Sequence, residues 1–237
     1  MNAIIFAAGL GTRLRPLTDN TPKALVKING KSLLEHNIIK LKIAGFDHIV
    51  VNIHHFGQQI IDFLAENNNF DTDIRISDER ELLLDTGGGI RKALSMFDDD
   101  NPVLIHNVDI ISDIDLKTVY EQHLINNCDA TLCIASRKTS RYLLFDENMR
   151  MRGWTNISTG EVKGEKAVNM FAFSGIHVVS KNIISSLEKN PKMVFPIMEY
   201  YISECANKNI IGHVLPEKTK WVDCGKPESL DVAASIL

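Results

Sequence analysis

The chain is organised around Ala3-Ile4-Ile5-Phe6, followed by Ala7-Ala8-Gly9-Leu10-Gly11-Thr12-Arg13-Leu14-Arg15-Pro16-Leu17-Thr18 and closed by Pro22-Lys23. The first four residues form a short apolar run, which is typical of a buried strand. The run ends in small residues and glycines. We therefore predict a buried first strand that opens into a flexible, basic loop.

The composition of this loop favours an anionic ligand. Gly9 and Gly11 let the backbone turn tightly and present N–H groups to anionic oxygens. Arg13, Arg15 and Lys23 add cations that suit a polyphosphate better than a single carboxylate. A glycine pair alone is equally compatible with a plain turn and solvated cations.

Two common phosphate-binding loops are excluded. A P-loop needs Gly-Lys-Ser/Thr, whereas Thr12-Arg13 follows Gly11 here. A dinucleotide fingerprint needs a third glycine and a helix that begins directly, but Pro16 and Pro22 keep this segment out of a helix.

The segment AAGLGTRLRPLT…PK resembles the signature loop of the sugar-1-phosphate nucleotidyltransferases, the enzymes that make nucleotide sugars. The resemblance implies that the loop wraps the triphosphate of a nucleotide, with contacts from Ala7, Ala8, Gly9, Gly11 and Thr12. It also implies that Arg13 neutralises the departing pyrophosphate and that Lys23 binds the reacting phosphates, including that of the sugar.

Length and charge limit the alternatives. A chain of 237 residues with 44% hydrophobic content can bury one sizeable core, and we expect one domain over residues 1–237. A net charge of -4 argues against a general nucleic-acid or membrane-surface binder. The apolar start is too short for a signal peptide or membrane span, and the four cysteines show no metal spacing. We expect a cytoplasmic protein with no obligate protein partner.

Apolar strands alternate with amphipathic helices over the first hundred residues. Strands are predicted at 48–53 and 73–77, and helices after the capping residue Ser32 and over 58–67. This rhythm indicates an α/β fold with a mainly parallel sheet, whose ligands lie beyond the carboxyl ends of the strands. The resemblance implies a Rossmann-like, mixed sheet flanked by helices, of the GT-A-like type.

A second glycine-rich motif, Asp85-Thr86-Gly87-Gly88-Gly89, is predicted to precede a helix that begins near Ile90. Glycines there allow close backbone approach and free amides at a helix N-terminus, although a flexible linker is the plainer alternative. The resemblance implies that Thr86, Gly87 and Gly88 border the nucleotide and that Asp85 lies near the sugar phosphate.

Two acids are candidates for a metal site. Asp109 ends the apolar segment 103–109, and an acid at a strand end faces the ligand crevice. Mg²⁺ is commonly held by one or two carboxylates together with substrate phosphates. Asp223 lies in Trp221-Val222-Asp223-Cys224-Gly225, which resembles the closing motif of the family, and the resemblance implies that Asp109 and Asp223 share the Mg²⁺ cofactor. The family usually has glycine before the first acid, whereas this chain has Val108. The nearby Asp113 and Asp115 favour helix capping.

The region 136–168 is charged and poorly periodic, and we expect a small β lobe over the sugar site, within the same domain. Glu165-Lys166-Ala167 only partly matches the family's sugar-phosphate segment. The resemblance places Ser174 and Gly175 on the sugar side, and Asn169 is a candidate by position.

The short chain, the turn Thr86-Gly87-Gly88-Gly89-Ile90 and the segment Phe173-Ser174-Gly175-Ile176 most resemble the bacterial N-acetylmuramate-1-phosphate uridylyltransferases. The favoured reaction is therefore transfer of a nucleoside monophosphate from UTP to N-acetylmuramate 1-phosphate. Mannose-1-phosphate guanylyltransferases and heptose-phosphate nucleotidyltransferases share most of the pattern. A glycosyltransferase would use an Asp-x-Asp motif, which residues 108–110 do not offer. A non-catalytic nucleotide-sugar binding protein should have lost Arg13 or one of the metal acids, and all three are present.

Overall fold

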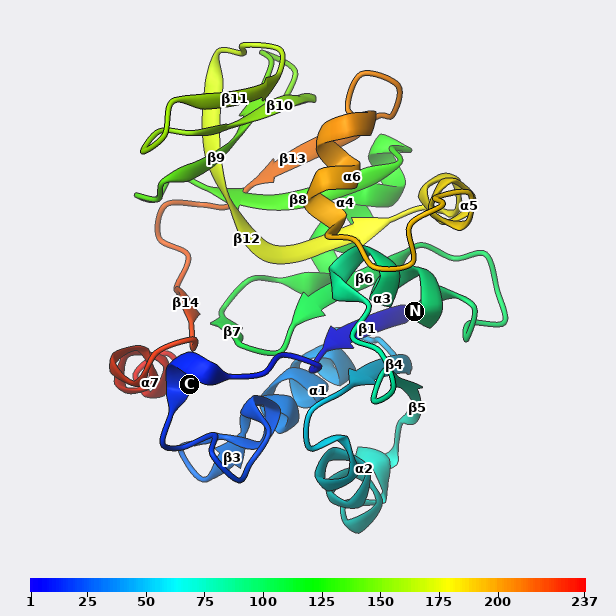
Figure 1. The fold of residues 1–237 in the computed structure, drawn as a ribbon, viewed down its shortest axis with the longest axis vertical. Coiled ribbons are helices and arrows are strands. Elements are labelled where there is room, and N and C mark those ends of the chain that lie inside the picture. Colours follow the sequence, from blue (N-terminus) through cyan, green and yellow to red (C-terminus); the bar gives the residue numbers. More distant parts are fainter.

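Strand β1 (Asn2–Phe6) lies at the centre of the sheet, parallel to β4 (His48–Ile53) on one side and to β6 (Val103–Asn107) on the other (Figure 1). The computed structural model describes residues 1–237. The ten strands of this sheet run in the order β11-β10-β9-β12-β6-β1-β4-β5, with β8 and β13 attached beside β12. The sheet is mixed, because β12 is antiparallel to β6 and β8 while β13 is parallel to β8.

The remaining elements follow the expected alternation. The other strands of the sheet are β5 (Asp73–Asp78), β8 (Ala130–Ala135), β9 (Arg141–Phe145), β10 (Met151–Asn156), β11 (Glu161–Gly164), β12 (Asn169–Val179) and β13 (Ile210–Val214). Two small ladders pair β2 (Lys27–Ile28) with β3 (Lys31–Ser32), and β7 (Ile110–Ser112) with β14 (Trp221–Asp223). The helices are α1 (Leu33–Ile43), α2 (Gly57–Glu66), α3 (Asp85–Leu94), α4 (Leu116–Asn126), α5 (Lys181–Glu188), α6 (Ile197–Glu204) and α7 (Pro227–Ala234). None of these helices is long and apolar enough to cross a membrane.

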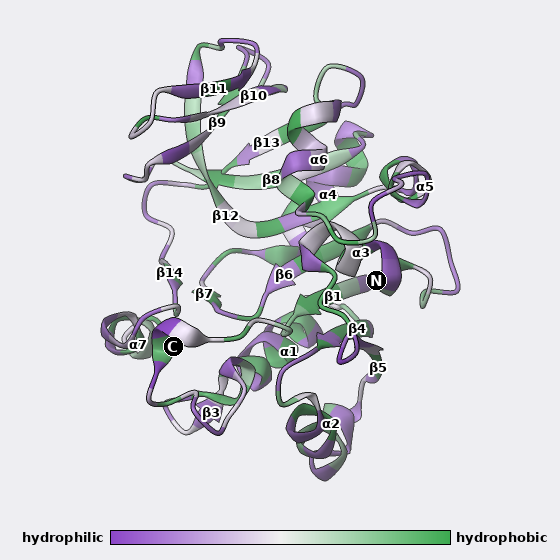
Figure 2. Cartoon of the chain, in the orientation of Figure 1, coloured by the Kyte–Doolittle hydropathy of each residue, from purple (hydrophilic) through white to green (hydrophobic).

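Alternate residues of β1 face opposite layers of helices. Ala3 and Ile5 belong to a core shared with α1, α2, α4 and α7, whereas Ile4 belongs to a core shared with α3, α5 and α6. Both faces of the central strands are therefore apolar, as expected for a sheet covered on two sides. Figure 2 shows the hydrophobic residues concentrated along these strands and hydrophilic residues on the outer strand β11. The predicted α/β fold with a mainly parallel, helix-flanked sheet is confirmed.

Local signals in the sequence predicted the starts of two helices, α1 and α4. Ser32 Oγ accepts a hydrogen bond from Glu35 N at 3.0 Å and caps α1. Asp115 caps α4 in the same way, accepting from Thr118 N at 3.0 Å. The capping role predicted for Asp113 is wrong, since its carboxylate accepts instead from Lys220 N at 2.9 Å.

The glycine triplet lies inside a helix, not before one. Gly87 and Gly88 occupy the first turn of α3, where both N–H groups donate to Phe195 O, at 2.8 and 3.4 Å. The prediction of free amides at this helix N-terminus is therefore wrong. A β-carbon on Gly87 would overlap the Phe195 ring, so glycine is required for the segment before α6 to pack on α3.

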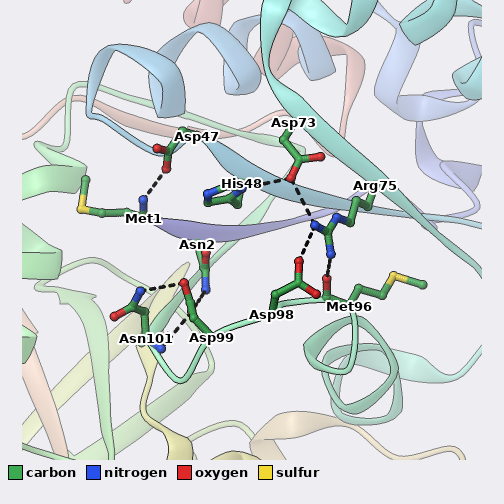
Figure 3. Close-up of polar contacts among 10 residues, drawn as sticks. All are labelled: Met1, Asn2, Asp47, His48, Asp73, Arg75, Met96, Asp98, Asp99 and Asn101. Atoms are coloured by element: carbon green, nitrogen blue, oxygen red, sulfur yellow. Dashed lines mark hydrogen bonds and ion pairs between the residues drawn. The ribbon is translucent and has the colours of Figure 1, made fainter.

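Figure 3 shows the edge of the sheet at which the parallel strands begin, opposite the edge formed by their carboxyl ends. The Met1 amino group pairs with Asp47, and Asn2 Nδ2 donates to Asp99 at 2.6 Å. Arg75 of β5 pairs with Asp98 at 2.7 Å. The contacts of Asp98 and Asp99 fix the segment between α3 and β6 to the amino ends of the strands. The polar groups drawn at this edge therefore pair with one another.

Replacement of Gly87 by alanine is expected to destabilise the fold by about 1–3 kcal/mol, because overpacking in a closed contact forces the backbone or the ring to move. The free energy of unfolding from urea titration measures this cost. Gly9→Ala is the control, since a β-carbon there meets nothing within 4 Å. Equal stability of the two variants would contradict the tight packing of Phe195 on α3.

Candidate active site

A cleft of about 580 Å³ lies at the carboxyl ends of β1, β4 and β6. Residues far apart in the chain line this cleft: Phe6, Ala8, Gly9, Leu10, Gly11, Thr12, Arg13, Lys23, Asn52, Glu79, Leu83, Asp85, Thr86, Asn107, Val108, Asp109, Val194 and Gly225. Nine of the residues predicted from the sequence are among them: Ala8, Gly9, Gly11, Thr12, Arg13, Lys23, Asp85, Thr86 and Asp109. The position agrees with the general rule for ligand sites in parallel α/β sheets.

The loop after β1 offers a row of free backbone donors. Its turn is held by Thr18 Oγ1, which donates to Gly11 O at 2.8 Å, and Gly11 has a φ of 64°. The N–H groups from Gly9 to Thr12 donate to no protein acceptor. Successive free N–H groups of this kind form a concave site for anionic oxygens.

The first two amides of the loop are already occupied. Asn52 Oδ1 accepts from Ala7 N at 2.7 Å and from Ala8 N at 3.2 Å. Ala7 is buried and does not line the cleft. The donors available to a ligand therefore begin at Gly9, two residues later than the sequence predicted.

Lys23 and Asp109 form an ion pair on the floor of the cleft. Lys23 is only 7% exposed. Lysine is rarely buried unless it is paired, and Asp109 provides the partner here. Its segment forms a short 3₁₀ turn, Lys23–Leu25, that places the chain beneath Gly11. A buried ammonium is thus fixed next to the carboxylate that follows β6.

The ladder between β7 and β14 places the backbone of Asp223 next to that of Asp109, the other predicted metal acid. Asp223 is opposite Ile110, and Cys224 N donates to Asp109 O at 2.8 Å. Asp223 lines a hollow of about 500 Å³ that adjoins the cleft at Arg13 and Gly225. Carboxylate oxygens such as those of Asp109 and Asp223 suit a hard cation that also takes phosphate and water ligands. Burial raises the pKa of the Cys224 thiol to about 12, so the sulfur stays protonated and offers no thiolate.

Arg13 lies across Gly225, between the cleft and the adjoining hollow. A β-carbon on Gly225 would lie 2.6 Å from Arg13 Nη2 and 2.7 Å from Asp223 Oδ1. Glycine in the closing motif therefore leaves the space that both side chains occupy. The guanidinium can bind anionic oxygens at the outer end of the loop.

Asp85 and Thr86 form the opposite wall of the cleft. Asp85 has a φ of 59°, and its Oδ1 accepts from Thr86 N at 2.6 Å. Thr86 Oγ1 accepts from Ile197 N at 2.9 Å, which fixes the threonine to the start of α6. Gly87 and Gly88, by contrast, do not line the cleft, because their backbone faces Phe195 and Met193.

The predicted sugar-side residues lie outside the cleft lining. Ser174 is buried, and its carbonyl accepts from Trp221 Nε1 at 2.8 Å. Gly175, with a φ of 77°, packs beside Ile110. Asn169 Nδ2 donates to Asp146 O at 3.1 Å within the strands β9 to β12. The structure thus connects Ser174 and Gly175 to the β7–β14 ladder and leaves Asn169 further away.

Sequence reasoning missed Asn52, Glu79, Asn107, Leu83 and Val194. Asn52 and Asn107 each lie at or next to the end of an apolar strand, which is the signal that identified Asp109. Glu79 follows β5 in the same way. Val194 lies between α5 and α6, and no local pattern indicates that this segment reaches the cleft.

No histidine lines the cleft. His106 is fully buried beneath it, and burial lowers its pKa to about 3, so the ring stays neutral at physiological pH. The arrangement can bind a polyphosphate, hold a divalent cation and orient a second anionic reactant. The cleft contains no histidine that could transfer a proton.

A family model described as nucleotidyl transferase matches residues 2–237. The chain is 30% identical to the N-acetylmuramate alpha-1-phosphate uridylyltransferase of Caulobacter vibrioides, over 96% of this chain and 93% of that protein. It is 41% identical to the enzyme of the same name from Neisseria meningitidis serogroup B, over 51% of this chain and 52% of that protein. HddC from Yersinia pseudotuberculosis, solved in complex with GMP-PN, has the same fold, with a TM-score of 0.78 at 24% identity over 99% of this chain and 98% of that one.

The family match spans nearly the whole chain, and the first of these relatives is covered almost completely. The chain belongs to the nucleotidyl transferase family, and it is a sugar-1-phosphate nucleotidyltransferase.

Proposed function

We propose that the protein transfers UMP from UTP to N-acetylmuramate 1-phosphate, giving the nucleotide sugar and pyrophosphate. The observation that carries the proposal is the convergence of the Lys23–Asp109 pair, the free loop amides and Arg13 in one cleft. The choice of base and sugar is supported by the name of the relative that matches over 93% of its length.

The reaction is an in-line displacement at phosphorus. An oxygen of the sugar 1-phosphate forms a bond to the α-phosphorus, and the bond to the bridging oxygen of pyrophosphate breaks. The attacking oxygen is already anionic, so no general base is required. Catalysis then consists of positioning two highly charged reactants and neutralising charge in the transition state.

The residues of the cleft divide this work. The N–H groups of Gly9, Gly11 and Thr12 bind the triphosphate oxygens, and Arg13 neutralises the leaving pyrophosphate. Lys23 lies between the loop and Asp109, where its ammonium reaches the phosphates that react. Thr86 borders the nucleoside on the opposite wall.

Asp109 and Asp223 would hold Mg²⁺, and the hard oxygen donors of this pair fit that ion. When bound, Mg²⁺ supplies positive charge to the phosphates and favours in-line geometry. Asp109 also forms the ion pair that holds the Lys23 ammonium in place, so this carboxylate would contact both cations.

The sugar side is formed by the region 136–168 together with Asp85, Asn169, Ser174 and Gly175 in this proposal. The strands β9 to β11 extend from β12, the strand that carries Ser174 and Gly175. We further propose that the protein acts in the cytoplasm, which is supported by its four unpaired, buried cysteines.

A substrate panel tests the proposal. The four ribonucleoside triphosphates are combined with the 1-phosphates of N-acetylmuramate, mannose, glucose and a heptose, and pyrophosphate release is measured with Mg²⁺ and with a chelator. We expect the highest kcat/KM for UTP with N-acetylmuramate 1-phosphate and no release under chelation. Faster turnover with GTP and mannose 1-phosphate would replace the proposed substrates.

Asp109→Asn is expected to lower kcat by about two orders of magnitude or more, comparable to the loss of one electrostatic stabiliser of a transition state. Asp113→Asn is the matched control, because that carboxylate binds Lys220 N away from the cleft. Pyrophosphate release at saturating substrate measures both variants. Similar kcat values in the two variants would remove Asp109 from the proposed mechanism.

Arg13→Ala is expected to lower kcat/KM by about two orders of magnitude as well. Gly225→Ala should displace the guanidinium without unfolding the protein and lower kcat/KM about ten- to hundredfold, because small misplacements at a reacting centre are costly. Adding Gly225→Ala to Arg13→Ala should then cause a smaller further loss than Gly225→Ala causes by itself, because only its contact with Asp223 remains to be disturbed. Independent, multiplicative losses would show that Gly225 does not act through Arg13.

A further inference from the structure

We propose that Asn52 and Glu79 are positioning residues for the nucleotide, which hold the signature loop at a fixed distance from the Asp85–Thr86 wall. This inference rests on the proposed nucleotidyl transfer in the cleft. Both side chains border the cleft but are almost fully buried, with 1% of Asn52 and 2% of Glu79 exposed. Their exposure leaves little surface for direct contact with substrate, so their effect would pass through the groups they bind.

Asn52 connects the loop to Glu79. Its Oδ1 accepts from Ala7 N and Ala8 N, at 2.7 and 3.2 Å, and its Nδ2 donates to Glu79 Oε1 at 2.9 Å. The two bonds to the loop fix the backbone immediately before Gly9, where the free donors begin. An amide is needed here, because one end of the side chain accepts and the other donates.

Glu79 carries the connection across to the opposite wall. Its Oε2 accepts from Leu84 N at 3.0 Å, one residue before Asp85. Its own backbone is held by Ile53, whose carbonyl accepts from Glu79 N at 2.8 Å, and by His54 Nδ1, which donates to Glu79 O at 2.7 Å. The carboxylate thus receives one bond from each side of the cleft.

The third glycine of the triplet makes room for this pair. A β-carbon on Gly89 would lie 2.9 Å from Glu79 Oε1 and 3.4 Å from Asn52 Nδ2. Gly87 and Gly88 are explained by packing against Phe195 and Met193, whereas Gly89 leaves space for the Asn52–Glu79 contact and for the Phe6 ring, which would lie 2.9 Å from the same β-carbon. A continuous series of hydrogen bonds thus connects Ala7 and Ala8, through Asn52 and Glu79, to Leu84. The series links the signature loop to the segment that carries the Asp85–Thr86 wall.

Reversing the direction of the central hydrogen bond tests the proposal. Asn52→Asp alone sets two carboxylates against each other, and Glu79→Gln alone leaves either Asn52 Nδ2 or Leu84 N without an acceptor. In the double variant N52D/E79Q the introduced amide donates to the introduced carboxylate. The loop amides and Leu84 N keep their acceptors, and the total charge of the pair is unchanged.

We expect each single variant to raise the KM for the nucleoside triphosphate about tenfold or more, since the donors beyond Gly9 lose their fixed position. The KM for the sugar 1-phosphate should change far less. The double variant should recover most of the nucleotide KM. Asn52→Asp alone should also improve at lower pH, where one of the two facing carboxyl groups is protonated and donates to the other.

Asn2→Asp is the matched control, because Asn2 Nδ2 also donates to a carboxylate, that of Asp99, at the far edge of the sheet (Figure 3). It should leave both KM values unchanged. Three results would overturn the proposal: unchanged nucleotide KM in the single variants, an equal rise in both KM values, or a double variant no better than the worse single one.

Affinity for a non-hydrolysable triphosphate analogue, measured by calorimetry, separates this inference from the proposed reaction. Wild-type protein that binds the analogue but releases no pyrophosphate would contradict the reaction alone. Analogue affinity that is lost in both single variants and regained in the double variant would still support the positioning role. Affinity that does not follow this pattern would overturn it.

Discussion

The short antiparallel pairing of β7 with β14 is the contact on which the site depends. It joins the strand that follows Asp109 to the strand that ends at Asp223, and Cys224 N completes it with a bond to Asp109 O. Together with the bonds of Lys220 to Asp113 and of Trp221 to Ser174, this ladder fixes the closing segment beside the sheet, where Gly225 lies next to Arg13. In Figure 1 the β14 strand, which belongs to the last part of the chain, lies next to β7.

Hydrogen bonds within the protein determine which backbone N–H groups remain available to a ligand. Asn52 removes the amides of Ala7 and Ala8 from the available donors, and Phe195 O removes those of Gly87 and Gly88. Buried backbone N–H groups must find an acceptor, so most of them are satisfied internally. The N–H groups from Gly9 to Thr12 border the cleft without one. A triphosphate bound in the cleft would contact these unpaired N–H groups.

The glycines of the three motifs have different structural roles. Gly11 adopts a positive φ that allows the loop to turn over Lys23, whereas Gly225 has no such backbone requirement and leaves space for Arg13 and Asp223. Gly87 is needed for packing alone. A glycine-rich motif therefore does not identify a ligand contact until the neighbours of each glycine are known.

Local patterns of polarity and hydrogen bonding were sufficient to predict the buried first strand, the alternation of strands and helices, the cap at Ser32 and the acid that follows β6. They could not determine that Asn52 and Glu79 pair, that Val194 reaches the cleft, or that Ser174 and Asn169 lie outside its lining. Those facts depend on which surfaces meet when distant segments pack, and no local pattern specifies them. Packing between distant segments therefore determines which amides, carboxylates and glycines of these motifs face the cleft and which are bonded or packed within the protein.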